Sequence, residues 1–191
     1  MMERATYFEK TIPIPNDVQI QIENSTVMVV GPRGSLTKDF SHASIHIEKS
    51  DEGVKTYVHN PRRKVAAKVN TVAAHIENMI LGVTHGFKYV MKIVYAHFPI
   101  TVRIDMNKKL VKIENFIGER GSRYARIFGD VNVTVTGDDV VIEGNSIEEV
   151  AQTAANIQAR TKIRNKDPRV FMDGIFVYQK LVGDKTIWKI L

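Results

Sequence analysis

Apolar and polar residues alternate in two stretches of the chain that repeat one order of features. The first reads PNDVQIQIENSTVMVVGPRGSL from Pro15, and the second reads PITVRIDMNKKLVKIENFIGERGSR from Pro99. Each holds two alternating runs around a polar turn, followed by the pattern Gly-x-Arg-Gly. Because side chains two positions apart share one face of a strand, each stretch predicts a hairpin with one apolar face. The corresponding apolar positions are Val18, Ile20, Val27 and Val29 in the first copy and Val102, Ile104, Val111 and Ile113 in the second.

The repeat continues through a second pair of short strands in each copy. Alternation predicts strands at 44–48 and 54–58 in the first copy, and at 131–135 and 140–144 in the second. Similarity that extends over this length indicates an internal duplication of a whole structural unit.

After these strands the apolar period changes to that of a helix in both copies. Asn60 and Ser146 are the predicted caps, with Pro61 in the first turn of one helix and a capping box in the other. Gly82 and Gly86 are expected to close the first helix. The apolar stripes are Val65, Val69, Val72, Ile76 and Ile80 in the first helix, and Val150, Ala154 and Ile157 in the second.

A small sheet with one apolar face requires a second layer to cover it, and a helix supplies that layer. We therefore predict an α+β protein with two tandem, internally duplicated domains, each a small antiparallel sheet packed against one helix. The predicted boundaries are 1–86 for the first domain and 87–191 for the second.

Cations occupy every second position of RTKIRNKDPR, residues 160–169. If this segment is an extended strand, their side chains lie on one face about 6.6 Å apart. Two interpretations are open, because such a row either protects the edge of a sheet as a solvated face or binds a polyanion such as a phosphate backbone. The cations are Arg160, Lys162, Arg164 and Lys166, with Arg169 just beyond.

Composition narrows the choice of partner and compartment. The chain has 191 residues and a formal net charge of +6, with a pI near 9.5, which favours acidic partners without separating nucleic acid from an anionic membrane. The absence of cysteine excludes disulfides, thiolate zinc sites and a cysteine nucleophile. The sequence has no apolar signal core and no run of about 18 apolar residues, so we expect a soluble cytosolic protein with no membrane partner.

The sequence contains no pattern typical of catalysis or cofactor binding. The stretch GPRG at 31–34 fits neither nucleotide-binding pattern and is interpreted as a bend between strands. The histidines lack metal-ligand spacing. His97, in the stretch YAHFP, is open to two interpretations, packing inside the protein or stacking on a nucleotide base. We expect no catalytic residue, metal, cofactor or small-molecule substrate.

Basic residues gather at three separated places, which suits a large shaped polyanion better than a small acidic ligand. Cations at the start of a helix are mildly unfavourable because the helix dipole is positive there, so an external anion would relieve the first group. The groups are Arg62, Arg63 and Lys64 before and at the first helix, Arg120, Arg123 and Arg126 in the second repeat, and the alternating cations of 160–169.

Five stretches resemble a known family, the large-subunit ribosomal proteins called L6 in bacteria and L9 in eukaryotes, and the similarity is closest to the eukaryotic branch. Together they cover nearly the whole chain. The stretches are VVGPRGSLTKDF (29–40), HNPRRKVAAKVNTVAAHIENMILGVTHGFKYVMKIVYAHFPI (59–100), ENFIGE (114–119), EGNSIEEVAQTAANIQ (143–158) and IRNKDPRVFMDGIFV (163–177).

The resemblance implies two similar domains, of which the second binds large-subunit rRNA near the sarcin-ricin loop and the stalk base. It implies neighbouring ribosomal proteins and nearby translation factors as partners, no enzymatic activity, and a cytoplasmic location after passage through the nucleolus. By resemblance, Asp173 and Gly174 shape a turn. The rRNA contacts transferred in this way are Arg160, Lys162, Arg164, Asn165, Lys166 and Arg169.

Two other classes of function remain possible at this point. A protein-interaction module whose basic surface is incidental would bind RNA equally well without the alternating cations. An enzyme acting on RNA would need a nucleophile or metal ligands, and the sequence indicates neither.

Overall fold

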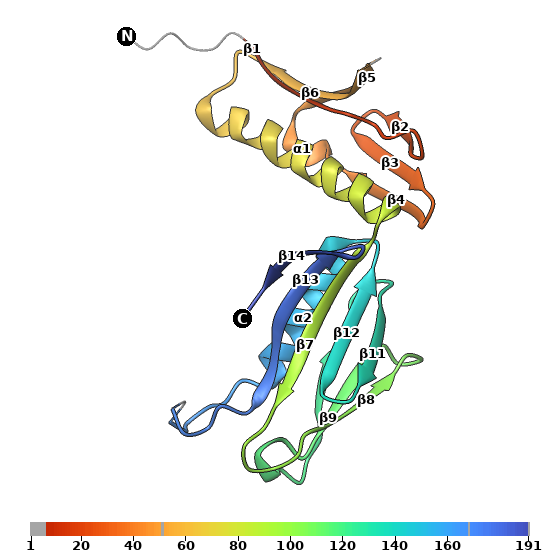
Figure 1. Cartoon of the computed structure of the whole chain (residues 1–191). Coiled ribbons are helices and arrows are strands. Elements are labelled where there is room, and N and C mark those ends of the chain that lie inside the picture. Colours follow the sequence, from red (N-terminus) through yellow and green to blue (C-terminus); the bar gives the residue numbers. More distant parts are fainter. Residues whose placement is uncertain (1–6, 51, 168, 191) are drawn as a thin grey trace. The chain divides into compact units, whose positions relative to one another are not determined.

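The computed structural model describes residues 7–50, 52–167 and 169–190. The chain divides into two compact units, Met1–His85 and Gly86–Leu191. Each unit combines small antiparallel sheets with one long helix (Figure 1), so the predicted α+β class with two duplicated domains is confirmed.

The first unit contains two three-stranded antiparallel sheets, in the orders β1-β6-β5 and β2-β3-β4. Its helix α1 packs against β1, β3, β4 and β6 and thereby covers both sheets with one apolar stripe. The stripe exists because Val69, Val72, Ile76 and Ile80 recur at helical spacing and are all buried. The elements are β1 (Tyr7–Ile12), β2 (Gln19–Glu23), β3 (Thr26–Gly31), β4 (Gly34–Asp39), a 3-10 turn (Ser41–Ala43), β5 (His46–Ser50), β6 (Gly53–His59) and α1 (Arg63–Thr84).

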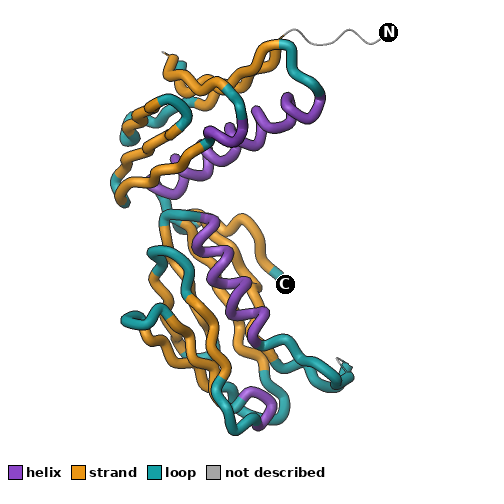
Figure 2. Tube along the Cα trace, turned by 180° about the vertical axis from the view of Figure 1, so that it is seen from behind, coloured by secondary structure: helices purple, strands orange, loops and turns teal. Residues whose placement is uncertain are grey.

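The second unit contains a five-stranded sheet in the order β11-β12-β7-β13-β14 and a three-stranded sheet in the order β10-β9-β8. The helix α2 packs against β7, β10, β12 and β13, and Figure 2 shows it lying along the strands from behind. The elements are β7 (Phe87–Val94), β8 (Thr101–Asp105), β9 (Leu110–Glu114), a 3-10 turn (Phe116–Gly118), β10 (Arg123–Arg126), β11 (Asn132–Thr136), β12 (Asp139–Gly144), α2 (Ile147–Arg160), β13 (Gly174–Val182) and β14 (Lys185–Lys189).

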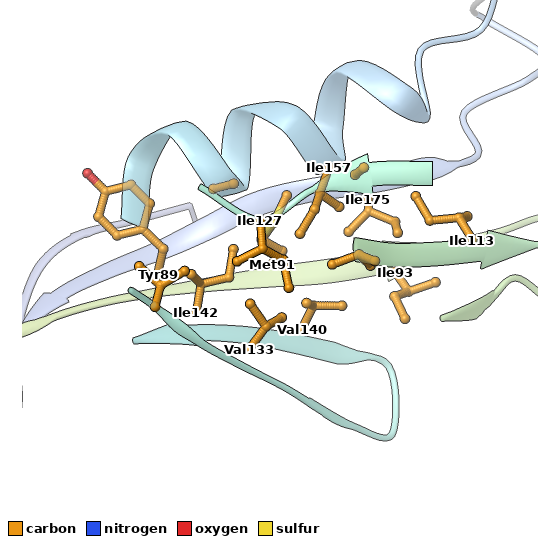
Figure 3. Packing of buried hydrophobic residues seen from close by; sticks show 14 of the residues in the cluster. Tyr89, Met91, Ile93, Ile113, Ile127, Val133, Val140, Ile142, Ile157 and Ile175 are labelled. Carbon is orange, nitrogen blue, oxygen red and sulfur yellow. The ribbon is translucent and has the colours of Figure 1, made fainter. Parts of the chain in front are cut away.

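The core of the second unit lies between α2 and the two sheets (Figure 3). Buried side chains from both sheets meet the apolar face of α2 there. The labelled residues are Tyr89, Met91, Ile93, Ile113, Ile127, Val133, Val140, Ile142, Ile157 and Ile175.

The duplication is visible strand by strand. The sheet β2-β3-β4 corresponds to β8-β9-β10, and β1-β6-β5 corresponds to β7-β12-β11, while β13 and β14 extend the second unit alone. The aligned apolar positions of the repeat face the two cores: Val27, Val29, Val111 and Ile113 are fully buried. The stretch at 31–34 is the tight turn between β3 and β4, as predicted.

Two details of the helix ends differ from the prediction. The cap of α1 is Arg62 and not Asn60, because Asn60 adopts a left-handed conformation that turns the chain before the helix starts. Gly82 is a buried residue inside α1, whereas Gly86, with a φ of 75°, lies just past the helix end as expected. The Ser146 cap of α2 is confirmed, since its hydroxyl accepts a hydrogen bond from the Glu149 N–H.

Candidate nucleic-acid interface

The alternating cations run from the last residue of α2 into the connection between α2 and β13, which we call the basic loop (residues 161–173). Arg160 is the last residue of α2, and residues 162–164 have no regular secondary structure. The predicted extended strand is therefore wrong. The segment pairs with no described strand, so it lacks the hydrogen-bonded ladder that defines a strand.

Burial nevertheless alternates along the start of the basic loop. Arg160, Lys162 and Arg164 are exposed, while Thr161 is buried and Ile163 is half-buried. The Thr161 hydroxyl accepts a hydrogen bond from the Ile175 N–H at 3.1 Å. This contact ties the loop to the start of β13. The cations therefore point to solvent although the segment is not a strand.

Burial no longer alternates in the second half of the basic loop, where residues 164–167 are all exposed. Asn165 has a φ of 58°, a left-handed conformation that asparagine tolerates better than most residues. The Arg169 N–H donates to the Asp167 carboxylate at 2.9 Å, and the Lys166 ammonium lies 4.5 Å from the centre of the Phe171 ring. Asn165 therefore has a backbone role, and its predicted RNA contact stays a prediction.

Arg123 holds the basic loop against β10. Its guanidinium donates to both carboxylate oxygens of Glu119, at 2.8 and 2.5 Å, and to the carbonyl oxygen of Arg160 at 2.7 Å. A longer contact of 3.5 Å reaches the carbonyl of Lys162, and the group lies 4.2 Å from the centre of the Phe116 ring. The same hydrogen bonds lower the pKa of Glu119 below its ordinary value. Most donors of Arg123 are thus engaged within the protein, and its predicted RNA contact stays a prediction.

A cleft of about 720 Å³ opens between the basic loop and the start of β10. Five cations line it, one of them Arg123, and of the described residues in its wall Glu119 alone is acidic. Tyr124, which is 50% exposed, adds an aromatic ring. The cationic residues in the wall that are available to a ligand are Arg160, Lys162, Arg164 and Lys166.

His97 lies at the far side of the basic loop. Its ring stacks on Phe171 with centroids 5.2 Å apart and remains 43% exposed. The buried carboxylate of Asp173 accepts a hydrogen bond from the Ala96 N–H at 2.6 Å, and its second oxygen, 3.8 Å from His97 Nδ1, has no hydrogen-bond partner among the described residues. Asp173 thus joins the end of the loop to the end of β7, while an RNA contact of His97 stays a prediction.

The remaining predicted contacts are not brought to this cleft. Arg120 and Arg126 are exposed in the second unit but do not line it. The basic group at 62–64 is exposed at the start of α1, in the first unit.

Sequence reasoning missed the role of Glu119. Glu119 and Arg123 are four residues apart with opposite charge, a spacing that brings side chains together on a helix. That rule does not apply to the irregular segment before β10, so the pair could not be inferred from spacing.

The part of the chain that the structure describes holds no candidate metal site and no candidate membrane-spanning helix. No cluster of three or more potential metal-ligating side chains occurs among those residues. No described helix has the length and apolar character that crossing a membrane requires.

The sequence of the chain matches known proteins over both units. A family model described as ribosomal protein L6 matches residues 14–86 and 98–174. The chain belongs to the ribosomal protein L6 family. The match spans both repeats and ends at the first residue of β13, so it includes the whole basic loop of this L6 family member.

Curated relatives match this L6 family member over almost its entire length. It is 46% identical to the large ribosomal subunit protein uL6 of Desulfurococcus amylolyticus, over 94% of this chain and 98% of the relative. The identity is 49% with the protein of the same name from Ignicoccus hospitalis, over 95% and 99%, and 50% with that of Methanosphaera stadtmanae, over 88% and 91%. The family expected from the resemblance is therefore confirmed.

Proposed function

We propose that the chain is a structural component of the large ribosomal subunit and binds its rRNA through the basic loop. The observation that carries this proposal is the cationic cleft, in which four exposed cations converge from the end of α2 and the loop that follows. The relatives named as large ribosomal subunit proteins cover the same residues.

Phosphate is the chemical group that this cleft suits. Lysine and arginine side chains gain affinity from an RNA backbone by neutralising phosphates and releasing counterions. Contacts of this kind position the protein, whereas the shape of the folded RNA supplies most of the selectivity. The Tyr124 ring in the cleft wall is available to stack on an unpaired base.

The proposed location on the subunit is the region of the sarcin-ricin loop and the stalk base, which the family resemblance implies. Neighbouring ribosomal proteins and translation factors would then be the protein partners. The proposed role is structural and needs no catalytic step, and its site of action is the cytoplasmic ribosome. In a cell with a nucleus, assembly would take the chain through the nucleolus first.

A salt series with a large-subunit rRNA fragment and the full chain tests the proposal. Four cations engaged with phosphates contribute about −2.8 to −3.6 to the slope of log affinity against log salt. The variant carrying Arg160→Gln, Lys162→Gln, Arg164→Gln and Lys166→Gln, which we call the cleft variant, is expected to lose that part of the slope.

The matched control removes four exposed cations elsewhere in the second unit, and should keep nearly the whole slope. Equal losses in both variants would show that only net charge matters, and an unchanged cleft variant would favour a protein-interaction module. The control substitutions are Arg103→Gln, Lys108→Gln, Lys185→Gln and Lys189→Gln.

A further inference from the structure

Four aromatic rings lie together on the outer face of the sheet β1-β6-β5 in the first unit. The imidazole of His46 stacks on Tyr57 with centroids 5.2 Å apart, and the Tyr7 ring contacts Tyr57 at 5.8 Å and His59 at 5.2 Å. Tyr57 and His59 meet edge to face at 5.5 Å. We call these four residues, Tyr7, His46, Tyr57 and His59, the aromatic face.

Strand register explains why these rings share one side. Tyr7 pairs with His59, and Tyr57 is the partner of His46. The residues next to these rings in sequence point to the other side of the sheet: Phe8, Ile47 and Val58 pack into the core under α1. The helix therefore covers the inner side of this sheet, and Figure 1 shows no other described element of the first unit on its outer side.

The rings are accessible although they touch one another. Tyr7 is 39% exposed, His46 and His59 are exposed, and Tyr57 is half-buried. Cross-strand aromatic pairs also stabilise a sheet without any ligand. Stabilisation of the sheet does not require His46 and His59 to be exposed, and their exposed rings remain available to a ligand.

The acids of the same sheet already have partners. The Tyr57 hydroxyl donates to Glu48 at 2.5 Å, and Glu9, two residues from Tyr7 on β1, pairs with Lys55. The Lys55 ammonium lies 5.6 Å from the centre of the Tyr7 ring. These contacts occupy both carboxylates, so the surface offers a ligand its ring surfaces rather than free acids.

Positive charge follows the aromatic face directly along the chain. His59 ends β6, and the exposed residues Arg62, Arg63 and Lys64 come three to five residues later. Because three extended residues span at most about 11 Å, Arg62 lies close to the ring end of the sheet. Cations at the start of a helix are unfavourable with respect to its dipole, so a bound anion would stabilise this arrangement.

We propose that the aromatic face binds unpaired RNA nucleotides, with bases stacked on its rings and phosphates held by the cations at 62–64. Stacking on aromatic side chains beside a cationic track is the general means by which proteins hold single-stranded nucleic acid. An apolar protein segment is a poorer occupant, because every ring here carries a polar atom and the cations at 62–64 follow the face along the chain. This surface adds a second RNA contact to the cleft and does not depend on it.

Binding of the full-length cleft variant to a 12-nucleotide oligouridylate isolates the aromatic face, because the cations of the other site are removed. Residual binding is expected. Adding Tyr57→Leu should weaken it by about 5- to 150-fold, the range for one base on one ring. Tyr57→Phe, which keeps the ring and loses the bond to Glu48, should stay within about 2-fold.

Absence of residual binding, or equal effects of leucine and phenylalanine at position 57, would overturn the proposal. Cross-linking of the unmodified chain to 4-thiouridine RNA checks it independently of folding defects: adducts are expected in β1 or β6, and adducts confined to the second unit contradict it. If the cleft variant binds rRNA normally while Tyr57→Leu does not, the proposed cleft function fails and the aromatic face stands.

Discussion

Replacing Glu119 by glutamine tests whether Arg123 positions the basic loop. Removing a negative charge from a basic RNA-binding surface ordinarily tightens binding, because phosphates are then repelled less. Glu119, however, accepts two hydrogen bonds from Arg123, and Arg123 in turn holds the carbonyl of Arg160. Losing the carboxylate should therefore loosen the cleft wall.

The two effects have opposite signs and can be compared. Removing one charge about 8 Å from a phosphate in water is worth about 0.5 kcal/mol before salt screening, or roughly 2-fold in affinity. A bidentate charged pair is stronger, but side-chain exposures of 28% for Arg123 and 42% for Glu119 reduce it to about 1 kcal/mol. We expect Glu119→Gln to weaken rRNA binding by about 2- to 5-fold.

Fluorescence anisotropy with a labelled rRNA fragment at fixed salt measures this change. The control is Glu114→Gln, because Glu114 lies on the neighbouring strand β9, pairs with Arg103 and Lys112, and changes the charge equally. The control should bind unchanged or up to about 2-fold tighter. If Glu119→Gln also tightens binding, Arg123 does not position the loop and the reasoning is refuted.

Three further predictions concern the supports of the basic loop. Thr161→Val leaves the Ile175 N–H without its acceptor and should lower the free energy of unfolding by about 1–3 kcal/mol, with faster hydrogen exchange of that amide. Asp173→Ala, which removes the acceptor of the Ala96 N–H, should destabilise by a similar amount of about 1–3 kcal/mol in a denaturant titration, whereas Asp173→Asn, which keeps an acceptor oxygen, should cost less. Arg123 lowers the pKa of Glu119. Their pairing should therefore be complete above the ordinary glutamate pKa of about 4.3 and should be lost as the pH falls through the lower pKa of the folded state. The Arg123 Nε–H signal in NMR spectra would report this loss.

The duplicated fold was predictable because its evidence is local. Alternation at positions such as Val27 and Val29 follows from strands that bury one face, and the stripe of α1 follows from a helix that buries one side. The strand β1 was missed because it pairs with β6 far along the chain, and no local pattern records that partner. The strand β14 was missed because all of its residues are exposed, so no burial pattern exists.

The candidate site was predictable in composition and not in geometry. The cations of 160–166 do line one cleft, yet they follow a helix end instead of a strand, and the loop depends on Thr161 and Arg123 for its path. Such contacts join residues far apart in sequence through backbone carbonyls and amides, which no side-chain pattern encodes. The sequence shows Arg123 only as an exposed-type cation, and the hydrogen bonds that it makes to Glu119 and to the Arg160 carbonyl could not be predicted.

Sedimentation of cell lysates through sucrose gradients at moderate and high salt tests the central claim most directly. Cells would carry either the unaltered chain or the cleft variant, with fractions probed for the protein beside bulk rRNA. We predict that the unaltered chain travels with the large subunit and resists high salt, while the cleft variant shifts to the top of the gradient as salt rises. An unaltered chain that stays at the top, or a cleft variant that remains bound at high salt, would contradict the account.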